Sequence, residues 1–174
     1  MQQGAQPAIA IRQLEVGDAA RYRVLRLESF LRFPDAHRTD YSEAAAQPLA
    51  WTENRLRARG EYWFGAFDGD ELVGAVGLRT QDGAKVRHIA TLLALAVDGR
   101  CQRLGIGRML VEHLLGVARS LGHIEQVQLT VNDGNTPAER LYDAFGFTQF
   151  GLEHQALRDA GKYYAKQHRQ LFLK

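Results

Sequence analysis

The spacing of hydrophobic residues along the chain changes several times, and each spacing predicts one type of secondary structure. Period-two alternation or a short apolar run predicts strands over residues 8–14, 62–67, 71–78, 87–97, 126–131, 148–153 and 163–173. Apolar residues three or four positions apart predict helices between Asp18 and Pro34, over 42–59 with an interruption at Pro48, over 106–121, and from Asn135 to Ala144.

The helical patterns also predict which side chains face the core. In the first helix the apolar stripe consists of Tyr22, Leu25, Leu27, Phe30 and Leu31. In the second helix Leu49 and Leu56 are expected to point inward. Asp18 can cap the first helix, residues 35–43 are polar and are expected to form a loop, and Asp68-Gly69-Asp70 is typical of a hairpin turn.

The order of these elements predicts an α/β fold. Strand pairs dominate the first half and strand–helix–strand units the second, which favours one twisted sheet with helices on both faces. No internal repeat or linker divides the chain. We therefore expect a single domain over residues 8–174, preceded by a flexible leader over residues 1–7.

Composition narrows the classes of partner. The 174 residues include 22 basic and 20 acidic side chains, so the net charge of +2 favours neither nucleic acid nor membrane as a partner. Cys101 is the single cysteine, which excludes a disulfide within the chain, and the histidines lack metal-ligand spacing, so no metal is expected. No apolar run is long enough to span a bilayer and the first residues do not resemble a signal peptide, so we expect a cytoplasmic protein.

A glycine-rich loop over residues 97–108 joins an apolar strand to the start of an amphipathic helix. Such a junction presents free backbone N–H groups and the positive end of the helix dipole. Gly105 and Gly107 remove the side chains that would keep an anion away, and Arg100, Arg103 and Arg108 add positive charge. The loop is therefore a candidate pyrophosphate site, although a glycine-rich turn that only packs helix against strand has the same pattern.

Two other phosphate-binding motifs do not fit this loop. A P-loop requires Lys-Ser/Thr after the glycine, whereas Arg108-Met109 follow Gly107. A dinucleotide fingerprint requires a glycine or alanine where Leu110 stands.

Two spaced motifs resemble the signatures of the GNAT superfamily of N-acetyltransferases. Gln102-x-x-Gly105-x-Gly107 after an apolar strand resembles its coenzyme A-binding signature, and Asn135-x-x-Ala138-x-x-Leu141-Tyr142-x-x-x-Gly146-Phe147 resembles its second signature. Lys85-x-Arg87-His88, Tyr163-Tyr164 and Leu171-Phe172-Leu173 look like a bacterial branch of unspecified substrate. The resemblance implies a mixed, mostly antiparallel sheet of about six to seven strands with splayed central strands, which here end at Val97 and Val131.

The resemblance also implies the binding of acetyl-CoA as co-substrate. The cofactor-binding set comprises Gln102 and the main chain of Arg103, Leu104, Gly105, Ile106, Gly107 and Arg108, which would hold the pyrophosphate. Leu95 and Val97 would pair through their backbone with the pantetheine arm, and a backbone N–H near Leu95 would bind the oxyanion. Asn135 would either bond the cofactor or cap its helix, and the two roles are equally compatible with the sequence.

Tyr142 is the candidate catalytic side chain, because the resemblance implies that its hydroxyl protonates the departing thiolate. The alternative is a core tyrosine with a hydrogen-bonded hydroxyl. Several relatives carry a glutamate base near the position of Thr91, and threonine cannot serve as a base. Histidine has a suitable intrinsic pKa for a base, but His88 lies near the start of its strand, which slightly favours a surface histidine. Acceptor-side carboxylates are the remaining candidates: Glu28, Asp35, Asp40 and Glu43.

The resemblance implies transfer of an acetyl group from acetyl-CoA to a primary amine, through a ternary complex and without a covalent Cys101 intermediate. The acceptor can be a small molecule or a protein amine, Trp51 is a candidate lining residue for its pocket, and monomer and homodimer both remain open. An acyl-CoA-binding regulatory module with little turnover is the alternative. A phosphoryl-transfer enzyme is disfavoured by the missing Lys-Ser/Thr.

Overall fold

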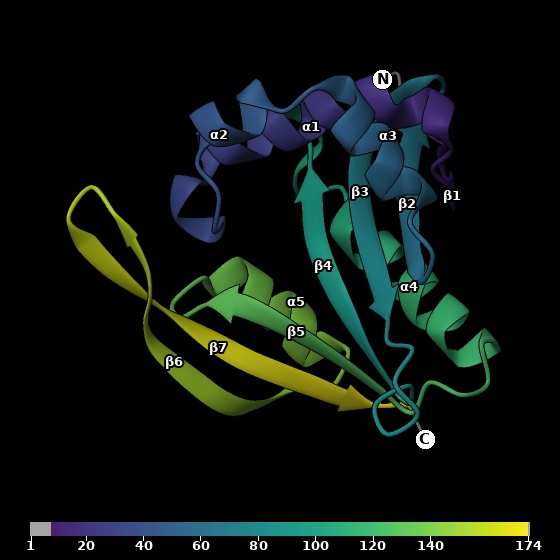
Figure 1. Cartoon of the computed structure of the whole chain (residues 1–174), viewed down its shortest axis with the longest axis vertical. Helices are drawn as coiled ribbons and strands as arrows, with labels where there is room; N and C mark the ends of the chain where they lie inside the picture. The colour runs from purple at the N-terminus through teal and green to yellow at the C-terminus, as the bar shows by residue number, and fades with distance from the viewer. Residues whose placement is uncertain (1–7, 174) are drawn as a thin grey trace, which may run out of the picture.

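The computed structural model describes residues 8–173, so the expected leader over residues 1–7 lies outside the described residues. Figure 1 shows the elements, which in chain order are β1 (Ile9–Gln13), η1 (Val16–Asp18), α1 (Ala19–Arg32), η2 (Pro34–Ala36), α2 (Tyr41–Ala46), α3 (Leu49–Arg57), β2 (Glu61–Asp68), β3 (Glu71–Thr80), β4 (Ile89–Val97), η3 (Gly99–Cys101), α4 (Ile106–Ser120), β5 (Gln126–Asn132), α5 (Thr136–Ala144), β6 (Thr148–Asp159) and β7 (Lys162–Phe172).

The strands form one seven-stranded sheet in the order β1-β2-β3-β4-β5-β7-β6. Neighbouring strands are antiparallel except β4 and β5, which are parallel. The predicted mixed, mostly antiparallel α/β sheet with splayed central strands is therefore confirmed.

Two apolar clusters hold the helices against the sheet. One packs α4 and α5 against it and includes Ile106, Leu110 and Leu114, each at most 1% exposed. The other contains Tyr22 and Leu25 of α1 together with Trp63 of β2. Because neighbouring strand residues point to opposite sides, the two clusters cover both faces, as the sequence predicts.

The helical layer formed by α1, α2 and α3 departs from the sequence prediction in detail. The helix predicted over 42–59 is two helices, α2 and α3, because Pro48 interrupts it as expected. Leu49 and Leu31 were expected inside but are 38% and 63% exposed, and neither belongs to the two apolar clusters. Leu56 does pack against the inner cluster.

Asp18 stands at the N-cap position of α1 but makes no capping hydrogen bond to that helix. Its carboxylate instead accepts hydrogen bonds from the Arg12 guanidinium at 2.7 and 2.9 Å and from the Glu15 N–H. The Arg12 hydrogen bonds hold the pKa of Asp18 below its usual value. The predicted cap is thus wrong, because a paired arginine on β1 holds the carboxylate.

Candidate active site

The pairing of β4 with β5 ends soon after it begins. Only Ile89, Ala90 and Thr91 pair with β5, opposite residues 126–128. Figure 1 shows the two strands together near their starts and diverging along their length. The β4 edge from Leu92 to Val97 therefore has no strand partner on the β5 side, and both Leu95 and Val97 lie on it.

A β-bulge interrupts β4 within this unpaired stretch. The β3–β4 register shifts between Gly77 opposite Leu93 and Ala75 opposite Ala96, so Ala94 and Leu95 lie opposite one residue of β3. Ala94 has a φ of 56°, which is rare for a residue with a side chain. Strained backbone of this kind concentrates at functional sites, and here it interrupts the regular pairing of Ala94 and Leu95 with β3.

The loop after β4 ends in backbone suited to an anion. Arg103 and Gly105 both have positive φ, at 67° and 77°, and Gly105 is the N-cap of α4. The first turn of α4 is closed by the hydrogen bond from the Met109 N–H to the Gly105 carbonyl at 3.0 Å. The amides of residues 105–108 precede that bond, so they have no acceptor within the helix.

Gly107 lies where three elements of the predicted site meet. A Cβ atom at this position would lie 3.6 Å from Leu141 Cδ2 of α5 and 3.9 Å from Val97 Cγ2 of β4. A Cβ at Gly105 would meet nothing within 4 Å. The start of α4, the end of β4 and α5 are therefore adjacent, and the surface above Gly105 is open.

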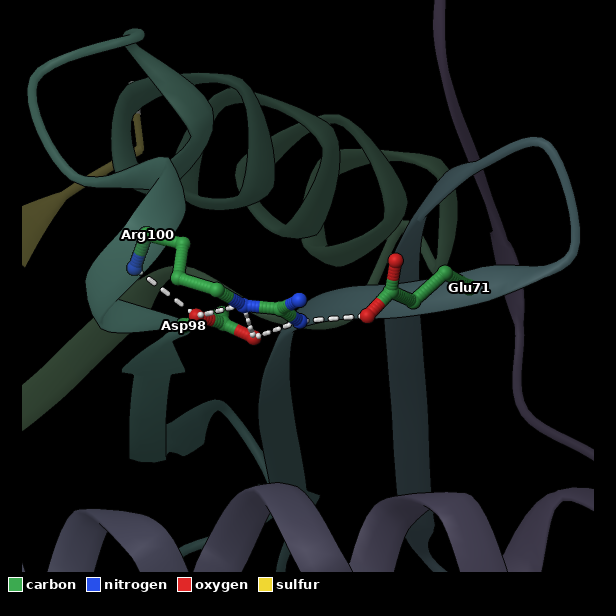
Figure 2. Close-up of polar contacts among 3 residues, drawn as sticks. All are labelled: Glu71, Asp98 and Arg100. Atoms are coloured by element: carbon green, nitrogen blue, oxygen red, sulfur yellow. Dashed lines mark hydrogen bonds and ion pairs between the residues drawn. The ribbon is translucent and has the colours of Figure 1, made fainter.

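Arg100 does not present a free charge to this loop. Figure 2 shows its guanidinium between Asp98 and Glu71; it donates to Asp98 Oδ2 at 2.7 Å and also binds Glu71. Asp98 accepts the Arg100 N–H at 2.8 Å as well, and these hydrogen bonds hold its pKa below the usual value. The two carboxylates compensate Arg100, whereas Arg103 and Arg108 are exposed and Arg108 lies over the Phe145 ring at 5.3 Å.

The second motif forms the N-terminal cap and the buried face of α5. Asn135 Oδ1 accepts the Ala138 N–H at 3.4 Å, so it caps the helix in this structure. Tyr142 is 6% exposed, and its ring meets Phe147 edge-on at 5.7 Å. Burial raises the pKa of Tyr142 above its usual value. Among residues 8–173 its hydroxyl has no hydrogen-bond partner within the chain.

The candidate bases lie apart from one another. His88 immediately precedes β4, and its carbonyl accepts the Glu125 and Gln126 N–H groups at the end where β4 and β5 still pair. Seven residues of strand separate it from Leu95, which is roughly 20 Å. Thr91 is the last β4 residue paired with β5.

The acceptor-side carboxylates serve structural roles or face solvent. Asp40 caps α2 by accepting the Glu43 N–H at 2.8 Å, and Glu28 is exposed. The Asp35 carbonyl accepts a hydrogen bond from Asn132 Nδ2 at 2.7 Å, which ties η2 to the end of β5.

Sequence reasoning missed a cavity of about 240 Å³ between α1, α3 and the segment that joins them. Trp51 lines it, as the sequence suggested, but Arg26 and His37 also line it and were not identified. Arg26 follows Tyr22 by four residues and precedes Phe30 by four, so all three share one face of α1. That spacing was the available signal, although it is also typical of an ordinary amphipathic helix.

His37 is held neutral in this cavity. Burial, and then the nearby Arg26 charge, lower the pKa of His37 to about 4. Its Nε2 lies 3.0 Å from Ser29 Oγ, and its ring contacts the Phe30 ring at a tilt of 37°, with 4.2 Å between centroids. The nearby Lys166 charge also lowers the pKa of His37, whereas the Asp35 charge raises it.

We expect His37 to make stability depend on pH. The histidine of the unfolded chain titrates at about pH 6.5, so between pH 6.5 and 4 the unfolded state binds more protons than the folded state. The free energy of unfolding should therefore fall as pH falls through this window. Replacing His37 by glutamine should remove about 1–2 kcal/mol of this fall, less than the full pKa difference because solvent screens a partly exposed ring.

Urea unfolding of the wild-type protein and of His37→Gln, each at pH 7 and at pH 4.5, measures this difference in the free energy of unfolding. His154→Gln, at an exposed histidine of β6, is the matched control and should keep the wild-type pH dependence. The same fall for wild type and His37→Gln would contradict the assignment.

No group of three or more histidine, cysteine, aspartate or glutamate side chains within residues 8–173 is arranged to hold a metal ion. None of the helices over the same residues is long and apolar enough to cross a membrane.

Known proteins resemble this chain in sequence and in fold. Mycothiol acetyltransferase of Geodermatophilus obscurus is 33% identical over 129 residues, which are 67% of this chain and 41% of the relative. N-alpha-acetyltransferase 30 of Homo sapiens is 29% identical over 140 residues, which are 79% of this chain and 38% of the relative. The chain thus spans about two fifths of the length of these curated relatives.

A proposed acetyltransferase from Salmonella typhimurium, solved with its cofactor acetyl-CoA, has the same fold. The TM-score is 0.81 at 21% identity, over 95% of this chain and 94% of that chain. A sequence profile described as the Acetyltransferase (GNAT) family matches residues 23–147. Since that match covers most of the chain and both predicted signatures, the chain belongs to the GNAT acetyltransferase family.

Proposed function

We propose that this chain is an acetyl-CoA-dependent N-acetyltransferase, a single cytoplasmic domain over residues 8–174 that moves an acetyl group directly to a primary amine in a ternary complex. The observation that carries the proposal is the junction of the unpaired β4 edge with the open N-terminus of α4. The junction offers backbone donors to a pyrophosphate next to a strand edge that can pair with a polar chain.

The residues present fit coenzyme A at this junction. The amides of residues 105–108 would hold the pyrophosphate, and the empty space above Gly105 leaves room for it. Gln102, Arg103 and Arg108 are exposed beside it. Backbone groups of Leu95 and Val97 would pair with the amides of the pantetheine arm, which supplies the acetyl group as a thioester.

The β-bulge supports a role for the Leu95 amide in the reaction. Negative charge builds on the thioester carbonyl oxygen when an amine attacks, and a donor already aimed at that oxygen lowers the barrier. Removing one such donor from an enzyme typically costs about 10²–10³ in rate. Tyr142, with its proton retained by burial, would protonate the departing sulfur.

The acceptor base is proposed to act through water or to be dispensable for an amine that is already neutral. Thr91 has no titratable group near neutral pH, and the separation of His88 from the bulge argues against His88 as the base. The rate should then rise with pH as the acceptor amine loses its proton.

We expect His88→Ala to lower kcat by no more than about twofold, as for a surface substitution remote from the reaction. Steady-state rates from pH 6 to 9 measure this with any competent acceptor. A large loss of rate, together with loss of an ionisation near neutral pH, would instead identify His88 as the base.

The names of the relatives indicate two classes of acceptor. One relative is named a mycothiol acetyltransferase and another a ribosomal protein bS18-alanine N-acetyltransferase, so a small-molecule or a protein amine is proposed here. An acyl-CoA-binding regulatory module is the second candidate, favoured by Thr91 where a carboxylate base is expected.

Initial-rate kinetics test the proposed mechanism. Double-reciprocal plots at several acceptor concentrations should intersect, as for a ternary complex, and Cys101→Ala should transfer acetyl at the wild-type rate. Parallel lines with an acetylated Cys101 would overturn direct transfer. Tight acetyl-CoA binding without thiol release across a broad amine panel would support the regulatory module.

A further inference from the structure

The cavity beside α1 is cationic and partly aromatic. Four arginines line it, Arg23, Arg26, Arg38 and Arg55, together with the rings of Phe30 and Trp51. No aspartate or glutamate is among its lining residues. A cavity with this lining favours an anionic group attached to an apolar body.

Three of these arginines already have a partner. Arg23 Nη2 donates to the Ala45 carbonyl at 2.7 Å. Arg38 pairs with Glu153 at 3.3 Å, and Arg55 lies 3.9 Å from a Glu61 carboxylate oxygen.

Arg26 differs from the other three. Its Nη1 is buried and has no hydrogen-bond partner among residues 8–173. The hydroxyl of Tyr22, one turn earlier on α1 and also lining the cavity, is buried and unpaired as well. The Phe30 ring lies 5.2 Å from the Arg26 guanidinium, which gives it an aromatic contact but no counter-charge.

A guanidinium whose Nη1 is buried without a carboxylate partner is costly, because the desolvation of that atom is not offset. Burial lowers the pKa of Arg26 below its usual value, because the charged form loses hydration. A bound anion would remove the cost, and its carboxylate could accept from both Arg26 and the Tyr22 hydroxyl.

The cavity also lies on the acceptor side of the proposed active site. Its wall at His37 and Arg38 follows η2, which is fastened by hydrogen bonds from Asn132 Nδ2 at 2.7 Å and from Lys166 Nζ at 3.3 Å. Asn132 ends β5, on the side where β5 has separated from β4. On the opposite wall, Tyr22 belongs to the apolar cluster against which Ala94 of the bulge packs.

We propose that this cavity binds the carboxylate of the acceptor through Arg26, so that the acceptor is an amine that also carries a carboxylate beside an apolar or aromatic group. The identity of the ligand as the acceptor rests on the proposed function. The anion site itself rests only on the cavity and its unpaired groups.

Binding of two small probes tests the anion site without any transfer reaction. Phenylacetate carries the carboxylate and a ring, and phenylacetamide is its uncharged counterpart. By calorimetry the wild-type protein should bind phenylacetate about tenfold or more tightly than phenylacetamide, since a hydrogen bond to a charged group is worth that factor. Equal affinities, or no measurable binding of phenylacetate, would overturn the site.

Arg26→Met keeps the length of the side chain and removes the charge. Phenylacetate affinity should fall about tenfold or more, while phenylacetamide affinity should change by less than about twofold. Arg21→Met is the matched control, because Arg21 is on the same helix, its side chain is 53% exposed, and it pairs with Asp18 at 3.8 Å. Unchanged phenylacetate binding by Arg26→Met would overturn the role of Arg26.

Thermal unfolding separates a binding role from a structural one. Because Arg26 carries an unpaired charge, Arg26→Met should keep or raise the Tm of the free protein and should lose the Tm increase that phenylacetate gives to wild type. If Arg26→Met unfolds early, Arg26→Lys retains the charge and should still prefer phenylacetate over phenylacetamide. Absence of that preference in Arg26→Lys would overturn the charge-based account.

Transfer kinetics test whether the carboxylate that binds in the cavity belongs to the acceptor amine. The ratio of kcat/KM for phenylalanine to kcat/KM for phenylalaninamide should be about tenfold lower in Arg26→Met than in wild type. The two amines differ in basicity, and this difference cancels when the ratio of the variant is compared with that of wild type. Transfer to both amines with an unchanged ratio would overturn the acceptor assignment and leave the proposed function intact. Transfer to no amine would instead overturn the proposed function, while phenylacetate binding still decides the anion site.

Discussion

Tyr142→Phe should lower kcat while nearly preserving acetyl-CoA affinity. The departing thiolate needs a proton, and loss of a general acid typically costs roughly 10²–10⁴ in rate. The loss can fall below this range, because a thiolate leaves more readily than an alkoxide. The phenylalanine ring keeps the edge-on contact with Phe147, so the change isolates the hydroxyl. Single-turnover transfer, in which chemistry limits the rate, measures the effect.

The structure refines what the pH profile of this variant should show. Burial raises the pKa of Tyr142, so the hydroxyl keeps its proton up to pH values above its usual range. Any fall in rate that follows deprotonation of this hydroxyl should therefore lie above about pH 10. The drop in rate should therefore be similar across the neutral range.

Tyr62→Phe provides the matched control for Tyr142→Phe. Tyr62 packs partly buried against the same apolar cluster from β2 and has no place in the proposed site. Its variant should transfer acetyl at the wild-type rate. Equal rates for wild type and Tyr142→Phe would show that Tyr142 is a core side chain without a catalytic role.

Gly107→Asp should weaken coenzyme A binding by about tenfold or more. A carboxylate several ångströms from the pyrophosphate costs about 1–4 kcal/mol, depending on the effective dielectric. The substitution should leave the fold intact, since the added Cβ meets Leu141 and Val97 at ordinary contact distances. An aspartate in the first turn of α4 also interacts favourably with the helix dipole. Calorimetric titration with coenzyme A measures the loss.

Gly107→Ala separates bulk from charge at the same position. The methyl group fits the same space without a negative charge, so its affinity should lie much nearer to that of wild type. If Gly107→Asp binds coenzyme A as tightly as wild type, the N-terminus of α4 is not the pyrophosphate site.

The elements that the sequence predicted well are those whose own residues determine them. Helix α4 carries an uninterrupted apolar stripe, begins beside Gly105 and ends before Gly122, which has a φ of 72°. The hairpin between β2 and β3 follows from Asp68-Gly69-Asp70, and Pro34 ends the first helix. Local propensity and the global fold agree at these places.

Other features depend on contacts between distant segments, and the sequence did not predict them. The exposure of Leu49 depends on which elements cover α3, and the length of β6 depends on pairing with β7, which carries it to Asp159 instead of the expected residue 153. The bulge at Ala94 requires positive φ at an alanine, a conformation that no local pattern predicts.

The same distinction between local patterns and long-range contacts applies to the candidate site. The glycine loop and the α5 motif were predicted because their residue spacing is specific, and the structure brings Gly107, Leu141 and Val97 together. The cationic cavity was not predicted, because Arg26 is unpaired only through the arrangement of α1, α3 and the segment around His37.

One measurement tests the central claim most directly: incubation with acetyl-CoA labelled in the acetyl group and a panel of primary amines, with and without a carboxylate. Free thiol and labelled product should form in equal amounts, and mass spectrometry with NMR should place the label on the amine nitrogen. Thiol release without a labelled amine, or a label on oxygen, on sulfur or on the protein itself, would contradict direct acetyl transfer to an amine.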